Sequence, residues 1–235
     1  MSGHHDFLNP RCRPATLRAY SPRRAILGAI RSGLPSLHGR LLDVGSGYAP
    51  YKPLVMALGS RVEDYVGLDL AGNQYQKPDI EWDGRTMPIE SGSFDCAMAT
   101  EVLEHCPDPQ VVLKEICRVL RPGGALLFTV PFLWPLHTVP YDEYRYTPFS
   151  LRRHLTEAGF SIRDLKALGG YHAALAQMIA LWVWRPGAAR WERSITTRLA
   201  TPIVYSLTQR DRPPTEFGEN VMITGLYGIA TKGEA

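Results

Sequence analysis

The sequence predicts an α/β fold built around a mostly parallel sheet, and three observations support this prediction. Short apolar runs typical of buried strands alternate with helical patterns, at the spacing of βαβ crossovers. The first run breaks into a glycine turn, Gly45-Ser46-Gly47, as at the carboxyl end of a buried parallel strand. The 235 residues suit one domain with an insertion, because no repeat or low-complexity tract divides them.

The expected elements follow from local signals along the chain. A first helix begins at Ser21-Pro22, which supply a cap and a first-turn proline, and it ends at Gly33. Further helices are expected over 52–58, 109–120 (capped by Asp108-Pro109) and 147–157. Strands are expected over 40–44, 65–70, 79–82, 93–100, 125–130, 160–168 and 221–232.

These elements predict four parts of the chain. They are a basic N-terminal arm and helix (1–40), a core (41–168), a helical insertion (169–218) and a closing strand of the core (219–235). A hydrophobic content of 45% and a charged content of 21% are globular and exclude a wholly disordered chain. The four cysteines form no CxxC pair, which argues against a disulfide framework or a cysteine-rich zinc site. With no signal-peptide pattern and no apolar run of membrane-spanning length, we expect a cytoplasmic protein.

Charge and aromatic residues are unevenly placed. Residues 1–40 carry seven arginines against Asp6 alone, which suits either an anionic partner or a solvated helix. Nucleic acid is an unlikely partner, because aromatic residues do not interleave with this charge. The insertion is apolar and tryptophan-rich and has the composition of an interfacial helix, with Arg185, Arg190, Arg193 and Arg198. Simple packing, a lid, a homodimer surface and peripheral membrane contact are the alternatives for it.

The glycine turn predicts a nucleotide site. Asp69 lies 22 residues beyond Gly47, at the end of the next strand, where it can accept hydrogen bonds from two ribose hydroxyls. A dinucleotide fingerprint needs a third glycine where this chain has Pro50. The carboxylate of Asp43, two residues before Gly45, would repel a pyrophosphate but suits a cationic amino group. The pattern therefore favours S-adenosylmethionine, whose sulfonium and ammonium groups are positive.

Four segments in order resemble the motifs of class I S-adenosylmethionine-dependent methyltransferases, in particular of the methyltransferase type 11-like kind: LLDVGSGYAPY, YVGLDL, WDGRTMPIESGSFDCAMATEVLEH and RVLRPGGALLFTVP. The resemblance covers about residues 40–168 and the final strand. It implies a Rossmann-like fold with a mostly parallel seven-stranded sheet whose last strand is antiparallel. It also implies S-adenosylmethionine as cofactor and S-adenosylhomocysteine as product.

The resemblance assigns cofactor contacts by position. The methionine part of the cofactor is expected among Asp43, Gly45, Ser46 and Gly47. Asp69 is expected at the ribose and Leu70 against the adenine, while Asp83 accepts the adenine amino group and Gly84 allows close approach. Thr100 and Glu101 are expected on the floor near the sulfonium.

The segment EVLEH holds Glu101, Glu104 and His105 within five residues. Some relatives that methylate quinone precursors hold a divalent cation with this segment, and such ligands suit one. The alternative is that the segment ends its strand and packs beside the cofactor. We assign no metal on this basis.

The segment 131–160 follows the fifth strand, where the fold places the methyl acceptor. It resembles a subgroup with a PLHxxPYDxxRYTP loop, often associated with bacterial polysaccharide and secondary-metabolite pathways. An imidazole is a fitting base for a hydroxyl acceptor, so His137 is the expected general base, with a structural hydrogen bond as the alternative role. The expected acceptor-binding residues are Tyr141, Asp142, Tyr144 and Arg145.

The sequence thus favours a methyltransferase enzyme that acts on an oxygen of a small molecule or glycan, such as a secondary metabolite or polysaccharide precursor. Nitrogen or carbon acceptors, including RNA, stay open, as does a non-catalytic subunit that binds S-adenosylmethionine. A nicotinamide-dependent oxidoreductase would use the same sheet, but Pro50 and Asp43 argue against it. The acceptor, the pathway and the oligomeric state are not defined by the sequence.

Overall fold

The computed structural model describes residues 5–233, so residues 1–4 of the predicted arm and 234–235 of the closing segment lie outside it. Its centre is a seven-stranded sheet with the order β3-β2-β1-β4-β5-β7-β6. Neighbouring strands pair in parallel except β7, which is antiparallel to both β5 and β6. The α/β fold and the antiparallel last strand are therefore confirmed. The strands are β1 (Gly39–Val44), β2 (Val62–Leu70), β3 (Ile80–Trp82), β4 (Phe94–Thr100), β5 (Leu120–Pro131), β6 (Phe160–Ala167) and β7 (Gly225–Lys232).

Helices cover both faces of this sheet, because successive residues of a strand point to opposite sides. In β1, Leu42 and Val44 join a core on the side of α4 and α5, whereas Leu41 joins a second core on the side of α2 and α3. The helices are α1 (His5–Leu8), α2 (Leu17–Gly33), α3 (Lys52–Val55), α4 (Pro109–Val119), α5 (Pro148–Glu157), α6 (Tyr171–Val183) and α7 (Arg190–Arg210). Three 3-10 turns accompany them: η1 (Pro14–Thr16), η2 (Leu34–Ser36) and η3 (Leu103–His105).

One helix and one strand begin earlier than the sequence predicts. Helix α2 begins at Leu17 and not at Ser21, so Pro22 lies inside it. The earlier start follows from packing, since Leu17 and Tyr20 lie in a third apolar cluster with α6 and α7. The expected strand 125–130 begins at Leu120, with an irregularity in its pairing to β4 between Phe94 and Cys96. Helix α4 begins as expected, since the carboxylate of Asp108 accepts the backbone N–H groups of Gln110 and Val111.

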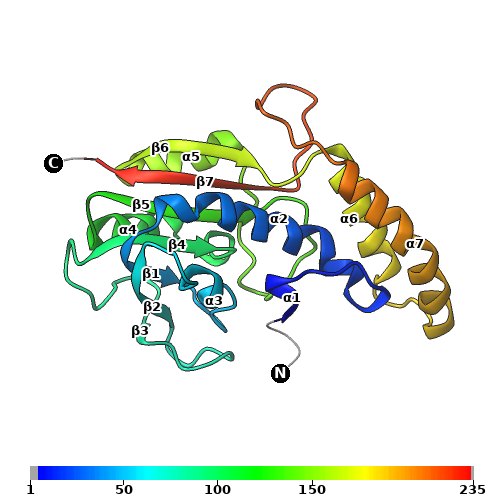
Figure 1. Cartoon of the computed structure of the whole chain (residues 1–235), viewed down its shortest axis with the longest axis horizontal. Helices are drawn as coiled ribbons and strands as arrows, with labels where there is room; N and C mark the ends of the chain where they lie inside the picture. Colours follow the sequence, from blue (N-terminus) through cyan, green and yellow to red (C-terminus); the bar gives the residue numbers. More distant parts are fainter. Residues whose placement is uncertain (1–4, 234–235) are drawn as a thin grey trace.

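Helices α6 and α7 project from one end of the sheet, beyond β6 and β7 (Figure 1). Their inner sides pack on α2 through small residues, among them Ala176, Ala180 and Ala200. No helix within residues 5–233 is both long enough and apolar enough to cross a membrane.

Candidate functional site

The carboxyl ends of the parallel strands gather the expected cofactor residues at one edge of the sheet, since parallel strands end on the same side. Asp43 belongs to β1 and Asp69 to β2, while Thr100 ends β4 and Glu101 follows it. Asp83 and Gly84 come directly after β3. Segments far apart in the sequence thus meet around one edge.

The turn after β1 needs glycine at two positions. Gly45 has φ 67° and Gly47 has φ 52°, values that side chains rarely adopt. A Cβ atom on Gly45 would lie 2.5 Å from Cγ2 of Val102, so the turn there is closed to any side chain. A Cβ on Gly47 would lie 3.8 Å from the Tyr75 ring, which leaves its backbone open to a close approach. Ser46 between them is buried.

Asp69 holds this turn against β2. Its Oδ2 atom accepts the backbone N–H of Gly47 at 2.8 Å, and its Oδ1 atom accepts that of Leu70 at 2.7 Å. The side chain of Leu70 is half exposed, and a Cβ on Gly84 would lie 3.2 Å from it. Asp83 organises its own turn, because Oδ1 accepts the backbone N–H groups of Arg85 and Thr86 at 2.8 Å each. These hydrogen bonds hold the pKa of Asp83 below its usual range.

Buried carboxylates make this edge strongly acidic. Asp43 is 4% exposed and accepts a hydrogen bond from the hydroxyl of Tyr65. Burial raises the pKa of Asp43 to about 7, the Tyr65 hydrogen bond opposes this rise, and the charge of Asp69 adds to it. Glu101 has φ 56°, a strained conformation outside glycine, and its Oε1 accepts the Thr129 hydroxyl at 2.8 Å. Burial raises the pKa of Glu101 to about 7 as well.

An acidic edge of this kind fits S-adenosylmethionine and not a dinucleotide. The sulfonium and ammonium groups are cationic, so they favour ionised carboxylates, whereas a pyrophosphate would be repelled by them. The observation of this structure that carries the fit is the buried carboxylate of Asp43, whose only direct hydrogen bond among the described residues comes from Tyr65.

Sequence reasoning missed Tyr51 and Phe7 beside this edge. Tyr51 is 4% exposed, and burial, with the charges of Glu101 and Asp43, raises the pKa of its hydroxyl. The ring of Phe7 meets it edge to face with centroids 5.9 Å apart, and Arg23 lies over the Phe7 ring. Pro53 in the segment Tyr51-Lys52-Pro53 predicts a helix start, but nothing in this segment indicates that α1 packs against Tyr51. The hollow between α1 and α2, lined by Tyr20, Arg24 and Arg31, contains none of the expected site residues.

The expected acceptor loop is fastened to η3. The backbone N–H groups of Glu143 and Tyr144 both donate to the carbonyl of Glu104, at 2.8 and 3.1 Å. The buried Tyr146 donates its hydroxyl proton to the carbonyl of Leu103 at 2.8 Å. The segment after β4 and the loop after β5 therefore form one unit.

Within this loop, Asp142 connects His137 to Arg145. The carboxylate of Asp142 is 2% exposed and accepts two hydrogen bonds from the Arg145 guanidinium, at 2.7 and 2.8 Å. It also accepts the backbone N–H of His137 at 3.0 Å, and these bonds, the Arg145 pair foremost, hold the pKa of Asp142 well below its usual range. The side chains of Tyr141 and Tyr144 are exposed. The Arg145 guanidinium is thus paired with Asp142 inside the loop.

The His137 imidazole is 30% exposed, and its Nδ1 atom lies 3.3 Å from Oδ2 of Asp142 without a hydrogen bond. Burial lowers the pKa of His137, while the charge of Asp142 opposes this effect. The ring meets His105 with centroids 4.7 Å apart and 68° between the planes. His137 is therefore a neutral imidazole near pH 7, at the rim of the acidic edge.

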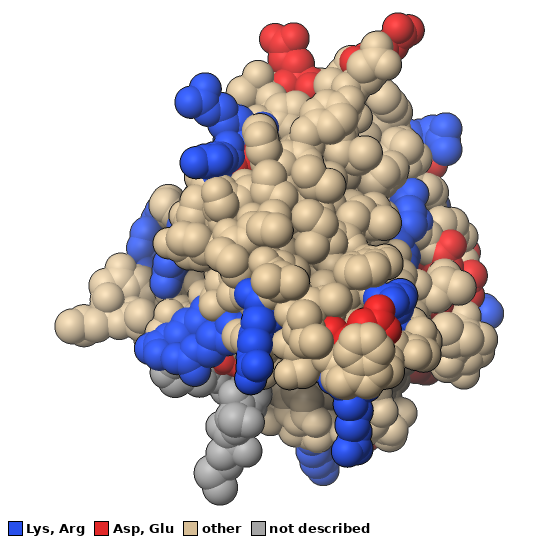
Figure 2. Space-filling view, turned by 90° about the vertical axis from the view of Figure 1, so that its right-hand side faces the viewer, with Lys and Arg blue, Asp and Glu red and all other residues tan. Residues whose placement is uncertain are grey.

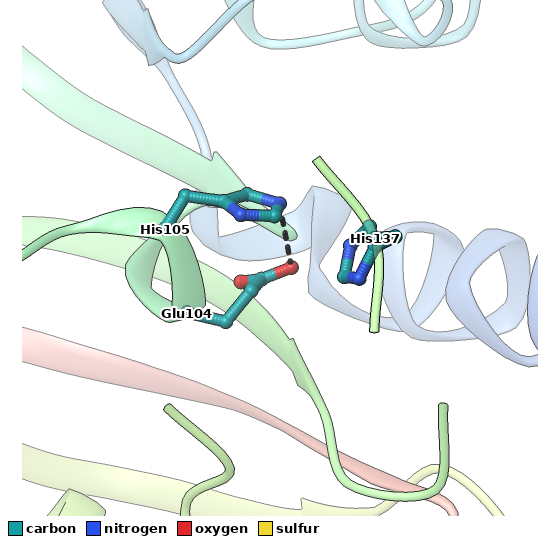
Figure 3. Close-up of side chains that lie close together, drawn as sticks. All are labelled: Glu104, His105 and His137. Carbon is teal, nitrogen blue, oxygen red and sulfur yellow. Dashed lines mark ion pairs between the residues drawn. The ribbon is translucent and has the colours of Figure 1, made fainter. Parts of the chain in front are cut away.

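A second cluster joins the two segments. Glu104 is fully buried, and neither of its carboxylate oxygens has a hydrogen-bond partner among the described residues. The carboxylate points into the space between the rings of His105 and His137 (Figure 3). One ligand atom from each of the three residues lies within 4.8 Å of the others. Burial, together with the charge of Glu101, raises the pKa of Glu104 well above its ordinary value.

The hydrogen bonds of His105 set its tautomer. Its Nδ1 atom lies 2.7 Å from the carbonyl of Tyr141, which can only accept, so Nδ1 carries a proton. The Nε2 atom then faces Oε1 of Glu104 at 3.7 Å, and in the neutral ring it offers a lone pair. An orphaned carboxylate between two imidazoles has the donor set for a divalent cation. Glu101, which the sequence grouped with Glu104 and His105, is replaced in this cluster by His137.

Comparisons with known proteins agree with this geometry. Residues 42–128 match the family described as "Methyltransferase domain". Over 126 residues, 48% of this chain, the sequence is 31% identical to a ubiquinone biosynthesis O-methyltransferase of Xanthomonas campestris pv. campestris. The match spans 21% to 51% of the length of such curated relatives.

Solved structures share the fold. The [4+2]-cyclase SpnF is 20% identical, with a TM-score of 0.57, and the match covers 92% of this chain and 84% of that one. A phosphoethanolamine N-methyltransferase 2 of Haemonchus contortus, solved with phosphomonomethylethanolamine and S-adenosylhomocysteine, is 14% identical with a TM-score of 0.54, over 100% of this chain and 61% of that one. Residues 42–128 thus match a methyltransferase domain, and the chain as a whole shares the fold of these solved structures.

Proposed function

We propose that this protein transfers a methyl group from S-adenosylmethionine to an oxygen atom of a small molecule or glycan. The observation that carries the proposal is the acidic edge, with buried Asp43 and half-buried Glu101, beside a loop that presents a neutral imidazole. The curated relative from Xanthomonas is named as an O-methyltransferase, which supports an oxygen acceptor. Because SpnF, a cyclase, shares the fold, the activity needs its own test.

The cofactor would lie along the strand ends. Asp43 would face the ammonium group, with the Gly45-Ser46-Gly47 turn around the methionine part, and Asp69 would accept the ribose hydroxyls. Leu70 and Gly84 would contact the adenine, and Asp83 would accept its amino group through the oxygen that the turn leaves free. Thr100 and Glu101 would lie near the sulfonium, where a carboxylate favours positive charge.

The chemical step is an in-line displacement. The acceptor oxygen forms a bond to the methyl carbon as the carbon–sulfur bond breaks, and the sulfur keeps the electron pair in S-adenosylhomocysteine. The hydroxyl proton passes to the imidazole of His137, which is neutral and free to receive it. Asp142, held by Arg145, fixes the backbone of His137 and so positions the ring. The exposed Tyr141 and Tyr144 would bind the acceptor.

The orphaned carboxylate of Glu104 favours a second role for the same imidazole. Glu104, His105 and His137 would hold a divalent cation, which would lower the pKa of an acceptor hydroxyl bound to it. In that case His137 is a ligand and not the base. The two roles differ in their response to chelators.

The test is methyl transfer from tritium-labelled S-adenosylmethionine to a panel of phenols, sugars, amines and RNA. We expect labelled product with hydroxyl acceptors, and a loss of about 10²- to 10⁴-fold in kcat for His137→Ala. The matched control is His172→Ala, an exposed histidine of α6 outside the acceptor loop. Activity that EDTA abolishes and Mn²⁺ restores would assign His137 to a cation site. If only amines or RNA become labelled, the proposal of a hydroxyl oxygen as acceptor is wrong. Cofactor binding without any labelled product would identify a non-catalytic subunit.

The organisation of the chain follows the same proposal. The basic arm and helix (1–40) and the closing strand (219–235) would complete the catalytic core (41–168). The insertion (169–218) holds α6 and α7 and would serve a separate purpose. A homodimer through this insertion is the alternative that sedimentation would detect.

A further inference from the structure

Helices α6 and α7 expose two lines of large apolar side chains on the sides that face away from their shared cluster with α2. On α6, the exposed residues recur every three or four positions: Tyr171, Leu175, Met178 and Trp182. On α7 they recur every four positions: Trp191, Ile195, Leu199 and Ile203. Each of these side chains is at least 50% exposed, although the opposite side of each helix is buried. These eight residues are called the outer face of α6–α7.

Nothing in the fold requires this exposure. The buried packing of the two helices on α2 uses Ala176, Ala180, Val183, Ala200 and Val204, and none of the eight exposed residues belongs to that cluster. Exposed apolar groups at this density mark a surface that meets a partner. The side of the molecule formed by α6 and α7 shows a broad uncharged area, with Lys and Arg along much of its edge and Asp and Glu at the top and right of the view (Figure 2).

The charge carried by α6, α7 and the turn between them is mostly positive. Residues 171–210 contain five arginines and one acidic residue, Glu192. Glu192 is paired with Arg185, whose guanidinium lies 4.4 Å from the centroid of the Trp182 ring. Arg190 and Arg198 are exposed. Helix α2, which contains Arg18, Arg23, Arg24 and Arg31, packs directly against α7 and extends the positive region.

Charge decides between the two candidate partners. A second copy of the chain would bring its own arginines against these, because a two-fold interface joins the same patch on both subunits. An anionic lipid surface offers acyl chains for the apolar residues and phosphates for the arginines. Tryptophan and tyrosine at the edge of an apolar patch are typical of side chains at the headgroup level. Neither helix can cross a membrane, so contact would be peripheral.

We propose that the outer face of α6–α7 docks on an anionic lipid surface, with Trp182 and Trp191 among the headgroups and Arg190 and Arg198 on lipid phosphates. The proposal does not depend on methyl transfer, because only the helix pair and its charge carry it.

The test is co-sedimentation of the full chain with vesicles of phosphatidylcholine alone or mixed with phosphatidylglycerol. We expect binding to the mixed vesicles, weakened by high salt, and no binding to phosphatidylcholine alone. Arg190→Gln with Arg198→Gln should weaken binding about 25-fold, since each basic residue near such a surface contributes about fivefold. Trp182→Ser with Trp191→Ser should also weaken it, and both pairs are exposed, so the fold is retained.

The matched control is Arg152→Gln with Arg153→Gln, two exposed arginines of α5 whose removal changes the net charge equally. Equal weakening by this control would show charge attraction without a docking face and would overturn the proposal. Absence of binding to the mixed vesicles would overturn it as well. So would a dimer in sedimentation that Trp182→Ser with Trp191→Ser dissociates, because the outer face would then be covered by a second copy.

Discussion

Replacing Asp43 with asparagine tests the electrostatics of the acidic edge. The carboxylate is 4% exposed, and burial raises its pKa to about 7. In the unfolded chain an aspartate titrates near 4. Asparagine keeps a side-chain oxygen that can accept the Tyr65 hydroxyl, so the substitution removes the charge and little else.

The size of the effect follows from this difference in pKa. Because the folded pKa lies above the unfolded one, the contribution of Asp43 to stability is full below about pH 4 and is lost as the pH rises through 7. A difference of about 3 pH units corresponds to about 4 kcal/mol. Relative to the wild type, Asp43→Asn should therefore gain about 4 kcal/mol in free energy of unfolding between pH 4 and pH 8.

Urea unfolding of both proteins at a series of pH values measures this difference directly. Other groups, such as Glu101, titrate in both proteins and cancel in the comparison. Glu63→Gln, an exposed position on the neighbouring strand β2, is the matched control and should show no such gain. A difference between Asp43→Asn and wild type that stays constant with pH would refute the burial of an ionisable Asp43.

Three further predictions follow from the site. Gly45→Ala should lower the free energy of unfolding, measured in urea, by about 2 kcal/mol or more, because its Cβ would lie 2.5 Å from Val102. Gly59 also has a positive φ but no neighbour within 4 Å of a Cβ, so Gly59→Ala should cost less. Arg145→Ala should cost about 2–3 kcal/mol, since it leaves the buried carboxylate of Asp142 without its strongest partner, and Arg152→Ala should be neutral. Millimolar Mn²⁺ or Zn²⁺ should raise the melting temperature of the wild type but not of Glu104→Gln; an equal rise in both would exclude Glu104 as a ligand.

Much of this architecture could be predicted from the sequence, because its signals are local. Asp108-Pro109 and Thr147-Pro148 supply caps, and α4 and α5 begin where these residues predict. The glycine turn follows β1, and Asp69 lies near the end of β2. Because these two parallel strands are neighbours, the sheet topology brings the turn and Asp69 together. The start of α2 could not be predicted, because Leu17 is helical through packing on α6 and α7, 150 residues or more away in the chain.

The candidate site shows the same limit. The cluster of Glu104, His105 and His137 joins two loops that only the tertiary fold brings together. The sequence suggested Glu101 in place of His137, because Glu101 is near in the chain. Likewise, no sequence pattern near Tyr51 predicts its contact with Phe7. Local patterns therefore predicted which residues lie at the strand ends, and contacts between loops required the structure.

The measurement that tests the central claim most directly is a calorimetric titration of the protein with S-adenosylhomocysteine, with NAD in a parallel titration and Asp69→Ala alongside. If the acidic edge is the cofactor site, S-adenosylhomocysteine binds the wild type, Asp69→Ala loses that binding, and NAD gives no heat. Binding of NAD, or full affinity of Asp69→Ala for S-adenosylhomocysteine, would contradict the assignment of this edge.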